Sequence, residues 1–190
     1  MSELLHEIEI RRAQRALNDL PIPQVVVDRI MLAATYAPSC SNKQPWRYIV
    51  VQSEEGRSKV QEALSSGNYW AKKAPVFILA FTSTELDCKL SDSRDYASFD
   101  LGLSVMNLLL QATKEGLIAH PMAGFDPVQL KGYFSIPSEY VLFAVIAVAY
   151  SGSTDGLSEK HRESEHSQRQ RKPLHDVVFA DTFSPPQGAA

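Results

Sequence analysis

Residues 37–46 hold the side chains whose types and spacing are best suited to binding chemistry. The stretch reads Ala37-Pro-Ser-Cys-Ser-Asn-Lys-Gln-Pro-Trp46, and Lys43 is its one side chain that is charged at neutral pH. Pro38 and Pro45 fix φ and disfavour helix at the residue before them, so the loop is stiff near both ends. Hydroxyl and amide groups on such a loop favour hydrogen bonding to a flat, polar-edged molecule over acid–base catalysis. A polar connection with Trp46 in the core is the alternative.

Three arginines near the start of the chain are the second candidate for chemistry. Leu4, Leu5 and Ile8 have helical spacing, so residues 3–17 are predicted to form an amphipathic helix. On that helix Arg11 and Arg15 share one face, and Arg12 lies about 100° round the axis. Cations this close repel one another, and a bound anion would relieve the repulsion. A solvated surface helix is the alternative interpretation.

The elements that must position these groups alternate between helical and strand-like patterns. Helices are predicted at 23–36, 54–64, 96–115 and 127–133, with Asp126 capping the last of them. Buried strands are predicted at 48–51, 75–81 and 141–150, and a strand that runs into a glycine turn is predicted at 117–125. This order indicates an α+β or mixed α/β fold in a single domain that spans residues 1–190. The tail is predicted to be a polar linker at 151–170 followed by an extended arm at 171–190.

Bulk properties narrow the functional class. The chain has 190 residues, enough for one domain with a substantial core, and its net charge of −3 disfavours nucleic acid as a partner. The longest apolar run, residues 141–150, is too short to span a membrane. Two cysteines make no disulfide framework, so the cytoplasm is the expected location. The helix at 96–115 is apolar nearly all round, which indicates that a second subunit covers part of it.

Four segments in the same order resemble the FMN-dependent nitroreductase family. Arg11-Arg-Ala-Gln-Arg15 and the loop at 37–46 resemble its opening, and Asn107-Leu-Leu-Leu-Gln-Ala112 with Glu115-Gly-Leu117 resembles its central helix. Pro121-Met-Ala-Gly-Phe-Asp126 resembles its turn beside the flavin ring. The segment that begins Arg169-Gln-Arg171 resembles its phosphate-contacting tail. Ala13 departs from the pattern, because the family commonly has a hydroxyl residue there.

The resemblance implies a fold, a cofactor and an assembly. The fold is α+β, with a central mixed but mainly antiparallel sheet flanked by helices, and the C-terminal arm extends to the partner subunit. FMN lies at the interface of a homodimer, where guanidinium groups suit its phosphate. Main-chain N–H groups of Ala123 and Gly124 approach the flavin N5 and O4, as a glycine there permits. The implied cofactor-binding residues are Arg11, Arg12, Arg15, Pro38, Ser39, Cys40, Ser41, Asn42, Gln44, Pro121, Met122, Ala123, Gly124, Arg169 and Arg171.

The implied activity passes hydride from NAD(P)H through flavin N5 to a nitroaromatic, quinone or related acceptor by a ping-pong mechanism. No catalytic side chain is required. Alternatives are the same fold with another flavin reaction, such as a dehalogenase or dehydrogenase, and a non-catalytic FMN-binding module. Asn68 is a weaker flavin contact.

The remaining candidates for chemistry are interpreted as structural. His120 is predicted to be a packed side chain, Cys40 a small buried thiol, and Cys88 a residue without a neighbouring thiol. His161, His166 and the glutamates around them have no fixed metal geometry, so no metal site is predicted.

Overall fold

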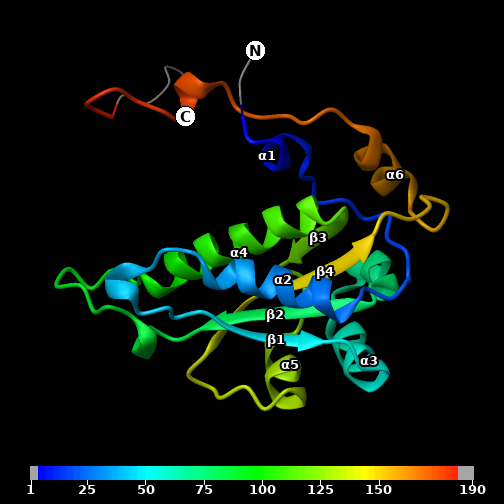
Figure 1. The fold of residues 1–190 in the computed structure, drawn as a ribbon, viewed down its shortest axis with the longest axis horizontal. Helices are drawn as coiled ribbons and strands as arrows, with labels where there is room; N and C mark the ends of the chain where they lie inside the picture. The colour runs from blue at the N-terminus through cyan, green and yellow to red at the C-terminus, as the bar shows by residue number, and fades with distance from the viewer. Residues whose placement is uncertain (1–3, 184–190) are drawn as a thin grey trace.

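An antiparallel four-stranded sheet forms the centre of the protein (Figure 1). The structure is a computed structural model that describes residues 4–183. The strands are β1 (Arg47–Val51), β2 (Val76–Thr82), β3 (Leu117–Met122) and β4 (Val141–Tyr150), in the order β1-β2-β4-β3. All three pairings between these strands are antiparallel, so the expected mixed sheet is antiparallel throughout its described part.

The inner strands separate two hydrophobic cores. Every residue of β2 is buried; Phe77 and Leu79 face one core, while Ile78 and Ala80 face the other. A strand covered on both faces has this continuous apolar sequence. β1 was predicted to be buried as well, but it lies at the edge of the sheet and is only partly buried.

Helices cover both faces of the sheet. In Figure 1, α2 (Gln24–Thr35) and α4 (Ala97–Lys114) lie on one side, while α3 (Glu54–Ala63) and α5 (Pro127–Tyr133) lie on the other. Asp126 caps α5 by accepting hydrogen bonds from the N–H groups of Val128 and Gln129, as predicted. Gly116 follows α4 with a φ of 74°, which glycine adopts without strain.

The N-terminal helix is much shorter than predicted. α1 spans His6–Ile10, and the chain then leaves the helix at Arg11, so Arg11 and Arg15 do not share a helix face. Leu17 forms a bridge with Ser151, and Gly152 N donates to Ala16 O at 2.7 Å. Pairing with the end of β4 therefore holds residues 16–18 in an extended form, and this tertiary contact overrides the local helical pattern.

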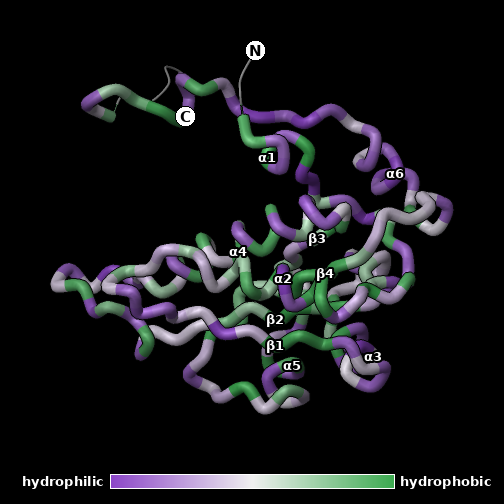
Figure 2. The backbone as a smooth tube through the Cα atoms, in the orientation of Figure 1, coloured by the Kyte–Doolittle hydropathy of each residue, from purple (hydrophilic) through white to green (hydrophobic). Residues whose placement is uncertain are grey.

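The predicted linker at 151–170 contains a helix. α6 spans Glu159–His166, and Ser158 caps it by accepting a hydrogen bond from His161 N at 3.4 Å. The helix and the segment after it are strongly hydrophilic (Figure 2), and this composition concealed the helix in the sequence. The predicted arm is mostly exposed as far as residue 183, with Asp176 and Phe179 partly buried and a short 3-10 turn at Leu174–Asp176. Residues 184–190 of the arm lie outside the described part.

Candidate functional site

A cavity of about 420 Å³ lies between the segment after α1 and the segment that includes the end of α6. Five arginines contribute to its wall, and no acidic residue is among the side chains that line it in the described part. We call it the arginine cavity. Its lining residues are Arg11, Arg12, Ala13, Arg15, Ser164, Ser167, Gln168, Arg169, Gln170 and Arg171.

Contacts between residues 150 to 161 positions apart in the sequence hold the two sides of the arginine cavity together. Arg169 donates to the carbonyl of Ile8 at 2.9 Å and also to that of Arg11. Glu165 on α6 is 8% exposed, and its Oε1 accepts from Arg15 N at 2.7 Å. A buried carboxylate bonded to main-chain N–H stabilises the local backbone, so Glu165 fixes α6 against the arginine segment.

Repulsion between cations is built into the arginine cavity. Partial burial lowers the pKa of the Arg11 guanidinium, and the positive charges of Arg169 and Arg171 lower it further. Arg171 donates to the carbonyl of its neighbour Gln170 at 2.6 Å and lines the cavity with the other four guanidinium groups. An anion with several oxygens would relieve this repulsion and accept hydrogen bonds from the guanidinium groups.

Two aromatic rings, those of Trp70 and His120, pack against the arginine segment. The Arg15 guanidinium carbon lies 5.8 Å from the centroid of the Trp70 ring, and the His120 ring lies 4.4 Å from the same tryptophan. The His120 Nδ1 atom is 3.0 Å from Gln14 O. The prediction of a packed histidine at position 120 is confirmed. Burial, together with the charges of Arg15 and Arg11, lowers the pKa of His120 to about 4.

The low pKa of His120 predicts an acid-sensitive stability. Between pH 6.5 and about 4 the unfolded chain binds a proton at this residue and the folded chain does not, so stability falls as the pH falls through this window. The loss amounts to about 3 kcal/mol once both states are protonated. The variant His120→Gln should flatten this part of the pH profile of Tm. His6→Gln, at an exposed position, is the matched control, and an unchanged profile for His120→Gln would refute the assignment.

The polar loop adopts a strained, exposed conformation. Ser41, Asn42 and Gln44 all have positive φ, between 49° and 54°, and their side chains are exposed. Ser39 Oγ accepts from Gln44 N at 3.0 Å, which closes the loop on itself. Non-glycine residues in this region of φ cost energy and occur where neighbouring structure requires them. Pro45 and Trp46, next to the polar residues, are buried and anchor the loop.

Both predictions about the cysteines are wrong. Cys40 is bonded to Cys88 in a disulfide with a Cα–Cα distance of 5.9 Å, so Cys40 is not a free buried thiol and Cys88 has a thiol partner. The segment after β2 folds back beside the polar loop and brings the two residues together. The pair is separated by 48 residues, and the sequence pattern around each cysteine holds no sign of the other.

The turn after β3 packs closely on the 3-10 segment Ser66–Lys73. Gly124 O accepts from Asn68 Nδ2 at 2.8 Å, and a Cβ atom at position 124 would lie 2.9 Å from the same Nδ2. A larger residue at position 124 would therefore have to displace the Asn68 side chain. Ala123 is exposed and Pro121 is partly buried, but the Met122 side chain is buried in the core. Only the main chain of Met122 is available to a ligand.

The structure brings part of the predicted site together. Arg11, Arg12, Arg15, Arg169 and Arg171 surround one cavity, while the polar loop at 38–44 lies at the far end of the molecule from α6 (Figure 1). Sequence reasoning missed the polar residues of α6 and its C-terminal end, among them Ser164, Ser167 and Gln168. The available signal was Ser158 in front of an uninterrupted run of helix-forming residues. The described residues contain no cluster of three metal-ligating side chains.

The α+β fold and the arginine cavity define a protein suited to an anionic, multi-oxygen ligand. The model of the Nitroreductase family matches residues 8–69 and 66–150 of the chain. The chain therefore belongs to the nitroreductase family.

Individual relatives agree with this assignment. The chain is 37% identical over 190 residues to the Bacillus subtilis protein named FMN reductase [NAD(P)H], covering 96% of this chain and 75% of that protein. It is 30% identical over 162 residues to a Methanothermobacter thermautotrophicus protein with the provisional name NADH dehydrogenase/NAD(P)H nitroreductase, covering 83% and 82%. A crystal structure described as an oxidoreductase containing FMN superposes with a TM-score of 0.85 at 30% identity, covering 97% of this chain and 96% of the other.

Proposed function

We propose that the protein is an FMN-dependent oxidoreductase that takes hydride from NAD(P)H and passes electrons to a nitroaromatic, a quinone or a related acceptor. The observation that carries the proposal is the arginine cavity, where five guanidinium groups converge without an acidic neighbour in the wall. A flavin phosphate carries close to two negative charges and accepts bidentate hydrogen bonds from guanidinium groups, so the cavity fits it. The names of the Bacillus and Methanothermobacter relatives support the same activity.

Bound FMN supplies the hydride chemistry, and the chain's own residues bind and orient the cofactor. The arginine cavity holds the phosphate. Ser39, Ser41, Asn42 and Gln44 supply hydroxyl and amide groups to the ribityl chain and the ring edge. The turn at Ala123 and Gly124 offers main-chain N–H groups to the ring. No side chain acts as a nucleophile in this scheme.

A second copy of the chain completes the proposed site. The polar loop and the arginine cavity lie at different ends of one chain, so one flavin contacts both only if the loop comes from a partner (Figure 1). An apolar cavity of about 540 Å³ among α1, α2 and α4 marks the surface proposed for this contact. Leu5, Leu32 and Tyr36 line it and are more than half exposed in the single chain. A patch of this kind is typical of an interaction surface.

Replacing Leu32 by glutamate should separate the proposed dimer. Its side chain is 56% exposed on α2, so the change leaves the core of a single chain intact, whereas a buried charge at an apolar interface costs several kcal/mol. Light scattering should give half the mass of the unchanged protein, with loss of bound flavin. Val128→Glu is the control, because Val128 is 79% exposed on α5, on the opposite face of the sheet. A dimeric Leu32→Glu variant would exclude this surface.

The purified protein tests the function directly. It should be yellow or take up added FMN, lose the flavin absorbance when NAD(P)H is added, and regain it with a nitroaromatic or a quinone. Reduction that neither acceptor reverses would favour another flavin reaction on the same fold. Reduction by dithionite but not by NAD(P)H would favour an FMN-binding module, and a colourless protein that ignores FMN would refute the proposal.

Three further expectations stay predictions from the sequence: a single domain over residues 1–190, an arm that reaches the partner subunit, and a cytoplasmic location. None of the helices in the described part is long and apolar enough to cross a membrane. The Cys40–Cys88 bond removes one ground for the location, because the cysteines were expected to be unpaired.

A further inference from the structure

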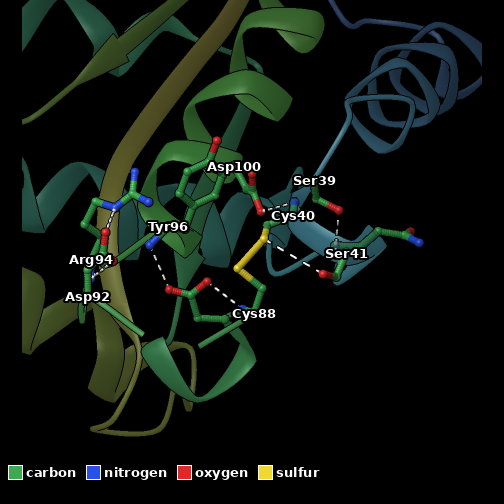
Figure 3. The surroundings of a disulfide bond; sticks show 10 residues. Ser39, Cys40, Ser41, Cys88, Asp92, Arg94, Tyr96 and Asp100 are labelled. Atoms are coloured by element: carbon green, nitrogen blue, oxygen red, sulfur yellow. Dashed lines mark hydrogen bonds and ion pairs between the residues drawn. A yellow bond between two sulfur atoms is a disulfide. The ribbon is translucent and has the colours of Figure 1, made fainter. Parts of the chain in front are cut away.

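Figure 3 shows the Cys40–Cys88 disulfide and the side chains around it. It joins the polar loop at 37–46 to the segment between β2 and α4. Both cysteines are partly exposed rather than buried in the core. Most disulfides that only stabilise a fold are shielded, whereas exposed ones exchange more readily with thiols.

The main-chain N–H group of each cysteine donates a hydrogen bond to a different aspartate. Asp100 Oδ2 accepts from Cys40 N at 3.0 Å, a contact drawn in Figure 3. Asp87 accepts from Cys88 N at 2.6 Å and from Tyr96 N at 2.7 Å. These bonds do not involve sulfur. They therefore keep the two cysteines in place when the disulfide opens, so that the bond can form again.

A cavity of about 530 Å³ lies beside Cys40. Cys40 lines this cavity and Cys88 is not among its lining residues. Apolar side chains from the start of α4 and from the segment before it form much of the wall. The cavity is lined by Pro38, Ser39, Cys40, Leu90, Arg94, Tyr96, Phe99, Asp100 and Leu103.

Asp100 gives the wall of this cavity a proton acceptor. Its side chain is 1% exposed, and Oδ1 has no hydrogen-bond partner among the described residues. A buried polar atom without a partner is costly and is uncommon unless it serves a ligand or a reaction. Burial, with a smaller contribution from the charge of Asp87, raises the pKa of the Asp100 carboxyl, which makes it a stronger base than an exposed aspartate.

We propose that the Cys40–Cys88 disulfide is a thiol-exchange site, and that the adjoining cavity admits a small thiol with an apolar body that attacks Cys40 Sγ. The exchange step itself needs no flavin, and the proposed oxidoreductase scheme gives no role to Cys88 or Asp100. The cavity does share Ser39 with that scheme, because Ser39 is also assigned to the flavin.

The exchange proceeds in two steps. The incoming thiol gives its proton to the Asp100 carboxylate, and its sulfur forms a bond to Cys40 Sγ as the bond to Cys88 Sγ breaks. The Cys88 thiolate takes up a proton. A second thiol then attacks the mixed disulfide and releases Cys40 as a thiol. In total, two thiols are oxidised to one small disulfide, and the protein disulfide gains two electrons and two protons.

Measurements on the wild-type protein test whether the disulfide is present and whether the cavity favours a thiol with an apolar body. Protein purified without reductant and alkylated in denaturant should show no free thiol, and two after treatment with dithiothreitol. Phenylmethanethiol should open the bond at least tenfold faster than 2-mercaptoethanol, because only its body fills the apolar cavity. Two free thiols in air-oxidised protein would overturn the proposal, and so would equal rates for the two alkyl thiols.

Single-cysteine variants test which sulfur is attacked. Cys40 in the Cys88→Ser variant should react with an aromatic disulfide reagent at least tenfold faster than Cys88 in Cys40→Ser, and the rates should become equal in urea. Phe99→Ala, at a side chain that is 55% exposed, should reduce the preference for phenylmethanethiol and leave the 2-mercaptoethanol rate unchanged. Faster reaction at Cys88, or a preference that survives Phe99→Ala, would overturn the assignment to this cavity.

Discussion

Replacing Arg11 and Arg171 together by glutamine is expected to abolish most FMN binding and to leave the folded protein as stable as before, or slightly more so. Each guanidinium lines the arginine cavity, and each contributes a hydrogen bond to a charged group worth about 1.5 kcal/mol or more. Losing both should therefore weaken FMN binding by about 3 kcal/mol, roughly a hundredfold in Kd. The folded chain loses repulsion, because the charge of Arg171 already lowers the pKa of Arg11, and the exposed local bond from Arg171 to Gln170 O is a small loss against it.

Two readouts separate loss of the ligand site from loss of the fold. FMN titration, followed by flavin fluorescence, measures the affinity, and thermal unfolding of the protein without flavin measures stability. Arg162→Gln is the matched control: Arg162 lies on α6 but does not line the cavity, and its ion pair with Glu159 is exposed. An unchanged Kd in the double variant would place the phosphate elsewhere, and a lower Tm would mean that the arginines stabilise the fold.

Local signals were enough to predict most of the sheet and its helices. The all-apolar run of β2, the proline and aspartate that open α5, and the glycine after α4 each act over a few residues, and the structure confirms them. The fold was predictable where the sequence pattern and the tertiary environment favour the same structure.

What the sequence could not predict depends on contacts between distant residues. Residues 11–17 were predicted to continue the first helix, but the backbone of residues 16–18 pairs with residues 150–152. α6 has no apolar face, and it is held by Glu165, which contacts a residue 150 positions away. The disulfide is a third case. In the candidate site, residue types predicted which arginines could converge, but the elements that carry them were predicted wrongly at both ends of the chain.

Gly152 is the position where this long-range pairing is most vulnerable. A Cβ atom there would lie 2.5 Å from the main-chain carbon and oxygen of Leu17, and neither atom can move without displacing the paired backbone. Gly152→Ala also strains the 2.7 Å bond from Gly152 N to Ala16 O. Overpacking and a lost hydrogen bond together should destabilise the protein by about 3 kcal/mol. For a chain of this size, that lowers Tm by roughly 6–12 °C.

Replacing Gly132 by alanine should instead stabilise the protein. Gly132 lies inside α5, where an added Cβ atom meets nothing within 4 Å, so alanine gains about 0.5–1 kcal/mol of helix stability. Because the segment next to Gly152 carries Arg15, Gly152→Ala should also weaken FMN binding, while Gly132→Ala leaves it unchanged. Calorimetry and FMN titration of the two variants compare a single methyl group at two sites. Equal Tm values would show that residues 16–18 are not fixed against the end of β4. That result would also contradict the placement of Arg15 in the wall of the arginine cavity.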